Sequence, residues 1–171
     1  DGGPHPLDLD RIPLDDQRVL GTFRRADTGG VFQFESGGMR RLLSDMQPDR
    51  LEDLIAANAL FRPGPMSLIP DYNARKHGKQ PVPAVHEAVD PILAETYGIM
   101  VYQEQIMKIA QDLAGYSLGE ADLLRRAMGK KKKSEMEKHQ SIFVSGATER
   151  GVEARVAESL FEQMVLFAEY C

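Results

Sequence analysis

The chain has very little cysteine and no long apolar run. A single cysteine among 171 residues, Cys171, excludes a framework of intramolecular disulfides and is typical of a reducing compartment. No apolar stretch approaches the roughly 18 to 20 residues that a membrane-spanning helix needs. The start is acidic, has neither the basic nor the apolar region of a signal peptide, and lacks an initiator Met. We therefore expect the chain to be a fragment, and we expect no membrane among its partners.

Familiar catalytic and metal-binding motifs are also missing. There is no phosphate-binding P-loop, no G-x-G-x-x-G, no cysteine pair and no nucleophile elbow. The histidines lie too far apart to form a metal-ligand pattern: His5, His77, His86 and His139. Asp8 and Asp10 form the kind of carboxylate pair that can hold metal ions for phosphoryl transfer. No apolar strand flanks this pair to hold it rigidly, so we expect no metal site there.

Acidic residues outnumber basic ones by 26 to 21, which gives a net charge of −5. The molecule as a whole is therefore not a generic binder of polyanions, and any nucleic-acid contact must come from a local patch. The stretch from Ser117 to Lys133 supplies such a patch. Within it, nine consecutive residues carry six cations and no acid: Arg125, Arg126, Lys130, Lys131, Lys132 and Lys133.

This basic stretch is predicted to begin as a helix. Ser117 and Glu120 have the S-x-x-E spacing of a capping box, apolar residues follow at helical spacing, and Gly129 is placed for a left-handed C-terminal cap. Arginine offers a planar fork for phosphate oxygens and lysine a mobile point charge, which indicates a phosphate site. A solvated basic face followed by a loop is the other interpretation, and charge alone leaves both open.

The remaining pattern predicts a mainly α protein. Apolar residues recur at helical spacing in most segments. Residues 31–35 are predicted to be extended, and residues 99–102 to be either a strand or a buried helix entry. Because the helices differ in length and the proline-rich loops are long, we expect an irregular multi-helical domain with one or two short extended segments. The helices are expected near residues 15–24, 36–47, 49–61, 66–78, 92–97, 103–114, 117–129, 134–150 and 153–169.

Cations and amides gather at the ends of these helices. Arg62 begins the stiff tetrapeptide Arg-Pro-Gly-Pro, which can hold its side chain in a fixed direction. Gln103 and Gln105 lie in the first turn of a helix, where free backbone N–H groups gather, and they either read a nucleotide or cap the helix. Together with Arg125, Arg126 and Lys130, these side chains suit a triphosphate. They lack the rigid carboxylate pair that would bind a metal and run a reaction.

Six segments in order carry a resemblance to a known family. They are IPLDD (12–16), TGGVFQFES (28–36), DLIAANALFRPGP (53–65), ARKHGK (74–79), ILAETYGIMVYQEQIMKIAQDLAGYSLGEADLLRRAMGKKK (92–132) and LFAEY (166–170). From about residue 10 onward, the chain resembles the alpha subunits of bacterial DNA polymerase III, the C-family replicative DNA polymerases. The resemblance implies residues 1–14 as a linker from the palm domain. It implies residues 15–171 as the N-terminal and central part of the fingers domain, incomplete at its C-terminus.

The resemblance also implies an activity for the parent protein. That activity is DNA-templated addition of deoxynucleotides to a primer end during chromosome replication, with two Mg²⁺ ions. The three metal-binding aspartates of the family's palm lie upstream, and Asp8 and Asp10 do not match them. We therefore expect no metal ligand and no polymerase activity in this piece by itself. The implied partners are a dNTP, primer-template DNA and other subunits of the replicative holoenzyme, in the bacterial cytoplasm and with no membrane.

Matching the family's LLRRAMGKK motif implies nucleotide binding by Arg125, Arg126 and Lys130, with Arg62 of the RPGP motif as a secondary candidate. Gln103 and Gln105 are weaker candidates, because only their helix position supports them. The alternatives are a non-catalytic helical module that binds nucleotide or DNA, and a structural segment whose lysines serve solubility.

The chain departs from the family at its C-terminus. The family continues past LFAEY into F-N-K-S-H-S, which this chain lacks, and it often has Gly where this chain has Cys171. In some members an intein is inserted at that point, and an intein's first residue is itself Cys. Cys171 is therefore either a polymerase residue or the first residue of an intein, and we favour an intein junction. In neither case do we expect Cys171 to take part in nucleotide transfer.

Overall fold

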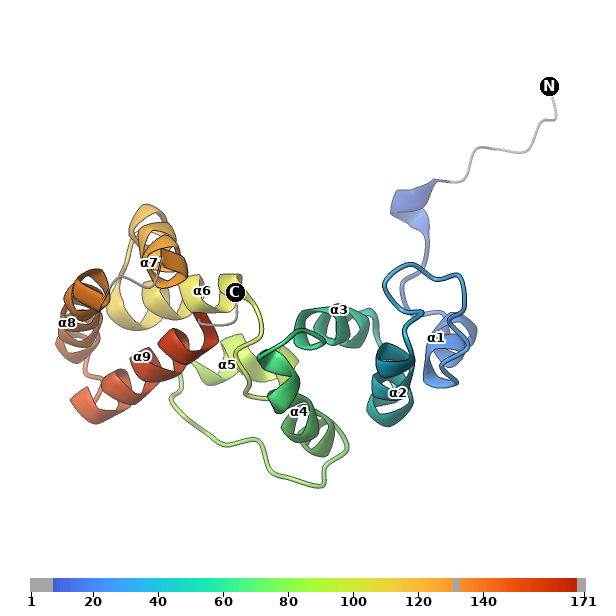
Figure 1. Cartoon of the computed structure of the whole chain (residues 1–171). Helices are drawn as coiled ribbons and strands as arrows, with labels where there is room; N and C mark the ends of the chain where they lie inside the picture. Colours follow the sequence, from blue (N-terminus) through green and yellow to red (C-terminus); the bar gives the residue numbers. More distant parts are fainter. Residues whose placement is uncertain (1–7, 131–132, 169–171) are drawn as a thin grey trace. The chain divides into compact units, whose positions relative to one another are not determined.

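A computed structural model of the chain describes residues 8–130 and 133–168. These residues form α-helices and short 3-10 helices joined by turns, and no β-strand occurs among them (Figure 1). The mainly α class is therefore confirmed. The chain divides into two compact units, Asp1–Ala57 and Asn58–Cys171. Cys171, the predicted intein junction, and the lysines at 131 and 132 lie outside the described residues.

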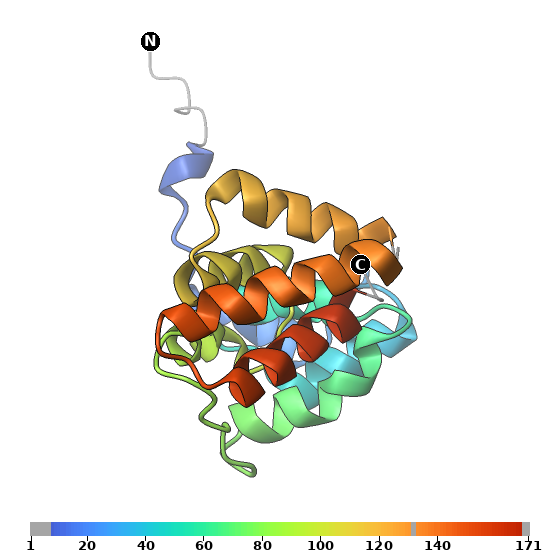
Figure 2. The same cartoon turned by 90° about the vertical axis from the view of Figure 1, so that its left-hand side faces the viewer.

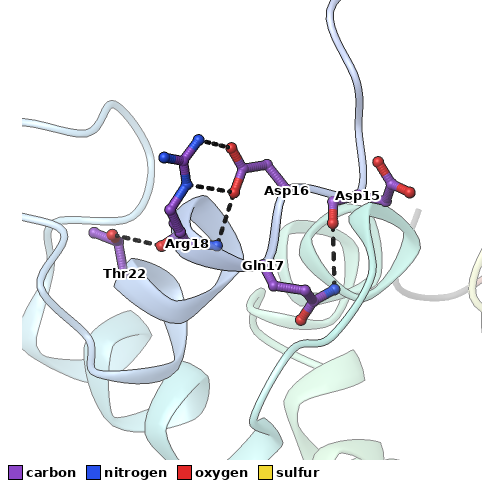
Figure 3. A network of polar contacts seen from close by, with 5 residues as sticks. All are labelled: Asp15, Asp16, Gln17, Arg18 and Thr22. Carbon is purple, nitrogen blue, oxygen red and sulfur yellow. Dashed lines mark hydrogen bonds and ion pairs between the residues drawn. The ribbon is translucent and has the colours of Figure 1, made fainter.

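Unit 1 contains α1 (Gln17–Arg24), α2 (Gly37–Met46) and most of α3 (Leu51–Leu60), preceded by the 3-10 helix η1 (Leu9–Arg11). Asp16 caps α1 by accepting a hydrogen bond from the backbone N–H of Arg18 at 2.8 Å (Figure 3). The guanidinium of Arg18 folds back onto the same carboxylate at 2.9 Å. Apolar side chains of α1 and α2 form the buried interior: Leu20, Met39, Leu42, Leu43 and Met46.

The predicted extended segment at residues 31–35 is wrong. These residues form consecutive turns, with Gln33 in the left-handed region at φ 67°. The hydroxyl of Thr28 donates to the carbonyl of Phe34 at 2.6 Å, and the carboxylate of Glu35 accepts from the N–H of Gly30 at 3.0 Å. The backbone and side chains of the segment therefore satisfy one another locally, and a partner strand is not needed.

Unit 2 holds the longer helices. Its first part contains η2 (Pro65–Leu68), α4 (Ile69–Lys76), α5 (Asp90–Leu93) and η3 (Ala94–Thr96). Its second part contains α6 (Gln103–Ala114), α7 (Leu118–Lys130), α8 (Lys133–Glu149) and α9 (Ala154–Ala168). Helix α6 packs against α7 and α8, and α8 lies beside α9 (Figure 2). Their apolar faces form one core that includes Ile109, Leu113, Leu124, Phe143, Leu160 and Met164.

Two helix backbones come very close in this core at the C-terminal end of α6. A Cβ atom on Gly146 of α8 would come within 2.3 Å of the carbonyl oxygen of Ala114. Only a residue without a side chain allows the two backbones to come this near. Gly115 then ends α6 in the left-handed conformation, at φ 71°.

The start of α7 agrees with the sequence, and its end does not. The backbone N–H of Ser117 donates to the Glu120 carboxylate at 2.8 Å, and the N–H of Glu120 donates to the Ser117 hydroxyl at 3.3 Å, which confirms the capping box. Gly129, however, does not have the positive φ expected of a cap, and α7 continues through Lys130. A glycine is tolerated inside a helix at a cost of about 1 kcal/mol.

Candidate functional site

Two adjacent arginines near the C-terminal end of α7 share one carboxylate. Oδ1 of Asp122 accepts from Nε of Arg125 at 3.0 Å and from its Nη2 at 2.7 Å. Oδ2 of Asp122 lies 2.8 Å from Nε of Arg126. Hydrogen bonding from Arg125, supported by the positive charges of Arg126 and Arg125, holds the pKa of Asp122 below its ordinary value. Asp122 is therefore a charged anchor for both guanidinium groups at neutral pH.

The two arginines occupy different surroundings because consecutive helix residues point about 100° apart. The side chain of Arg125 is 32% exposed, and its Nη1 donates to Oε1 of Gln103 at 3.2 Å. The side chain of Arg126 is 63% exposed, and Asp122 is its only partner among the described residues. Arg125 thereby ties the end of α7 to the start of α6.

The two candidate glutamines at the start of α6 have different positions. Gln105 is buried, and its Oε1 accepts from the backbone N–H groups of Val101 and Tyr102 at 2.8 and 3.0 Å. Its Nε2 donates to the hydroxyl of Thr96 at 2.8 Å. Gln105 is therefore engaged as a helix-capping and packing residue, which was one of the two roles the sequence left open. Gln103 is half-buried and faces Arg125.

Two small hollows meet at Gln103. One, of about 200 Å³, is lined by Arg62, Gln103 and Glu104, with Tyr102 and Phe167 among its walls. The other, of about 100 Å³, is lined by Gln103, Arg125, Arg126 and Phe167. Arg62 and the arginine pair thus line different hollows that share Gln103 and Phe167. The ring of Phe167, in the last turn of α9, is part of both walls.

Lys130 lies away from these two hollows. It lines a third hollow, of about 560 Å³, between α7 and α8. Arg126 is also part of this third hollow, together with Lys138 and His139. Arg126 therefore lines both the 100 Å³ hollow and the third hollow, whereas Lys130 lines the third hollow and neither of the two that share Gln103.

The arrangement at Arg125 and Arg126 is suited to binding an anion. Asp122 and Gln103 engage three N–H groups of Arg125 and leave one N–H on each of Nη1 and Nη2. Asp122 engages only Nε of Arg126 and leaves both Nη groups. These N–H groups are without a partner among the described residues. The two hollows that share Gln103 are each smaller than an ordinary small-molecule site of roughly 300–1,000 Å³, so they fit part of a ligand such as a phosphate group.

Sequence reasoning missed two residues of this site. Asp122 lies three and four residues before the arginines, a spacing at which helix side chains meet, and that spacing was the available signal. Phe167 was predicted only as part of an apolar helix stripe. Its place between the two hollows depends on how α9 packs, for which the sequence carries no local signal.

Two features are absent from the described residues, 8–130 and 133–168. No group of three or more His, Cys, Asp or Glu side chains is placed to hold a metal ion. No helix is both long enough and apolar enough to cross a membrane.

The sequence of this helical chain matches that of a known domain. The chain belongs to the family of the bacterial DNA polymerase III alpha subunit finger domain, whose model matches residues 3–151. It is 56% identical to the DNA polymerase III subunit alpha of Thermus aquaticus, over an alignment that covers 96% of this chain and 14% of that protein. The protein of the same name from Escherichia coli K12 is 49% identical, covering 98% of the chain and 15% of that protein.

A relative from Halalkalibacterium halodurans, also a DNA polymerase III subunit alpha, is 47% identical over 97% of this chain and 15% of its own length. The resemblance stated from the motifs is therefore confirmed. The chain spans only about 14–15% of the length of these relatives.

Proposed function

We propose that this chain binds the triphosphate of an incoming dNTP and positions it for DNA-templated primer extension. The observation that supports this most strongly is the shared anchor at Asp122. It holds two guanidinium groups side by side and leaves their Nη groups available for phosphate. A hydrogen bond between charged groups is worth about 1.5–3 kcal/mol, and arginine can engage two phosphate oxygens at once.

The neighbouring groups favour the same ligand. The first turn of α6 carries the positive end of the helix dipole, which favours an anion. Arg62 adds a further exposed cation at the adjoining hollow, although Glu104 lies there too. We assign Arg125 and Arg126 as the main triphosphate ligands, Arg62 and Gln103 as secondary ones, and Lys130 to the outer end of the same charged surface. We assign Gln105 no contact with the nucleotide.

The parent protein, by the same proposal, is a replicative DNA polymerase of the bacterial cytoplasm that works with primer-template DNA and other holoenzyme subunits. By the resemblance, its Mg²⁺ ions would be held by palm carboxylates outside this chain. Metal ions of this kind neutralise charge on a transferring phosphoryl group. This chain's own contribution is to bind and orient the phosphates.

The first experiment tests whether the chain alone is inactive. The 171-residue chain should not extend a primer, because the metal-binding carboxylates of the two-ion mechanism are proposed to lie elsewhere. Primer extension by the pure chain that a chelator abolishes would overturn this part of the proposal.

The second experiment tests the arginines in a complete enzyme. This chain replaces the matching segment of the Thermus aquaticus relative, and single-turnover incorporation is measured at varied dNTP concentration. Arg125→Ala or Arg126→Ala should lower kcat/KM for the nucleotide roughly tenfold to a hundredfold, with a smaller effect on primer-template affinity. Arg155→Ala, an exposed arginine in the first turn of α9, is the matched control and should behave as the parent chimaera.

Two results would contradict the triphosphate role. One is normal incorporation by both alanine variants. The other is a loss of DNA affinity alone, with a shallower dependence on salt, which is the behaviour of a contact to the DNA backbone.

A further inference from the structure

We propose that Asp122 is a positioning residue of the triphosphate site, which fixes the geometry of the arginine pair at the expense of its net positive charge. This inference rests on the proposed function of Arg125 and Arg126. Asp122 itself touches neither nucleotide nor metal in this proposal. It acts through the two guanidinium groups that it holds.

The contacts divide the two guanidinium groups into an inner and an outer edge. Asp122 takes the Nε edge of Arg125 and the Nε of Arg126 through different carboxylate oxygens. Gln103 takes one N–H of Nη1 of Arg125 from the other side. The outer Nη groups are thus aimed by bonds at their inner edges. A phosphate can bind the outer edge without displacing Asp122.

Holding the arginines in this way has a benefit and a cost. Arginine is a long side chain with many rotamers, and orienting it before the ligand arrives lowers the entropy lost on binding. The carboxylate also places a negative charge beside the phosphate site, which weakens the general attraction for any polyanion. Geometry and charge therefore make opposite contributions, and removing Asp122 should change them in opposite directions.

Asp122→Asn separates these contributions because asparagine keeps the shape and removes the charge. Arg125 and Arg126 use different oxygens of Asp122, and asparagine puts an NH₂ group, which cannot accept, in place of one of them, so one of the two arginines loses its partner. General attraction for polyanions should rise, whereas the orientation of the pair is lost. Asp122→Glu keeps the charge on a longer stem and should restore part of the orientation.

The first test uses the 171-residue chain and inorganic tripolyphosphate. The Asp122→Asn variant should bind tripolyphosphate as tightly as the wild type or a few times tighter, with a steeper dependence on salt. In NMR spectra the Nε–H signals of Arg125 and Arg126 should be protected from solvent exchange in the wild type and unprotected in Asp122→Asn. Tripolyphosphate should shift the Nη signals of the wild type and leave the Nε–H protection in place.

The second test uses the chimaeric polymerase described above. Asp122→Asn should lower kcat for nucleotide incorporation about tenfold without raising KM, and Asp122→Glu should recover part of that loss. A merely structural role would instead lower thermal stability and weaken tripolyphosphate binding together.

The outcomes separate the two proposals. If Arg125→Ala leaves tripolyphosphate binding and incorporation unchanged, the triphosphate site itself is wrong. If Arg125→Ala weakens both but Asp122→Asn keeps the wild-type kcat, only the role of Asp122 is overturned. Loss of Nε–H protection when tripolyphosphate binds would also overturn it, because Asp122 would then be a competitor that the ligand displaces.

Discussion

The two ends of helix α6 differ in almost every physical respect. At the N-terminal end, Gln103 accepts a hydrogen bond from Arg125 and lines two hollows, and N–H groups of the arginine pair remain available to a ligand. At the C-terminal end, the carbonyl of Ala114 lies so close to Gly146 that no side chain fits between the backbones. One end is open, charged and half-exposed, whereas the other is tightly packed.

The difference shows how one helix can serve both stability and function. Close packing at the C-terminal end fixes α6 against α8, and the core behind it joins α7 and α9 to the same body. The N-terminal end can then carry a polar side chain such as Gln103, which contributes little to folding, because the other end already holds the helix in place. Functional sites often lie on such rigid supports.

The largest expected effect comes from filling the tight end. Gly146→Ala should lower the free energy of unfolding of unit 2 by about 3 kcal/mol, the upper part of the usual range for overpacking, because the atom that is met is backbone. Urea denaturation followed by circular dichroism measures this loss. Gly119→Ala in α7 is the matched control. Its Cβ would meet nothing within 4 Å, and it should be neutral or stabilising by about 0.5–1 kcal/mol.

Equal stability of the Gly146→Ala and Gly119→Ala variants would contradict the contrast between the two ends of α6. It would mean that α6 and α8 can separate at this contact without cost, and that the tight end does not anchor the helix.

The next effect separates two glutamines at the open end. Gln105→Ala should lower the free energy of unfolding by about 2 kcal/mol, because it leaves the buried N–H of Val101 without its acceptor and removes a bond to Thr96. Gln103→Ala should change stability by less than about 0.5 kcal/mol. In the chimaeric polymerase it should weaken dNTP binding by a few fold, since Arg125 loses one of its two supports.

Nucleotide binding measured alongside unfolding checks both halves of this prediction. A Gln103→Ala variant as unstable as Gln105→Ala would show that Gln103 also supports the fold. An unchanged stability in Gln105→Ala would remove its structural role.

The sequence predicted these regions unequally. Local spacing predicted the mainly α class and the capping box at Ser117 and Glu120, and the structure shows both. Helix position and family motifs grouped Arg125 with Gln103, and the structure brings these two side chains together. Helix caps are predictable because all the atoms involved lie within a few residues.

Other features depended on distant parts of the chain. The extended prediction for residues 31–35 failed because glycines and the Thr28 hydroxyl favoured turns over a strand that had no partner. The contact between Gly146 and Ala114 joins residues 32 positions apart in the sequence, so no local pattern reveals it. The role of Phe167 between two hollows likewise depends on packing.

A smaller effect is expected from the polar cap that follows the tight end. Ser117→Ala removes the hydroxyl that accepts from the N–H of Glu120, and loss of such a cap typically costs about 1 kcal/mol. Thermal unfolding compared with Ser141→Ala measures this cost. Ser141 is exposed within α8, its hydroxyl donates only to a carbonyl of its own helix, and its loss should stay within about 0.5 kcal/mol. A loss no larger than that of the control would show that α7 does not need its cap.

The smallest expected effect is a titration at the same cap. Hydrogen bonds from the backbone N–H and the hydroxyl of Ser117 lower the pKa of Glu120 from its ordinary 4.5. A lowered pKa in the folded state means that this stabilisation is complete above about pH 4.5 and is lost as the pH falls through the folded-state value. The pKa of Glu120 measured by NMR should therefore lie below 4.5 in the wild type and move up toward it in Ser117→Ala.

The neighbouring tyrosine gives an independent reading of the same charge. Burial, and after it the charge of Glu120, raises the pKa of Tyr116 to about 12. Glu120→Gln should therefore lower the pKa of Tyr116 slightly and leave most of its elevation, because burial is the larger cause. A Tyr116 pKa that returned to its ordinary 10 in Glu120→Gln would mean that charge dominates there. In that case the tight end of α6 would be less buried than its packing against Gly146 requires, and the contrast between the two ends would be weakened.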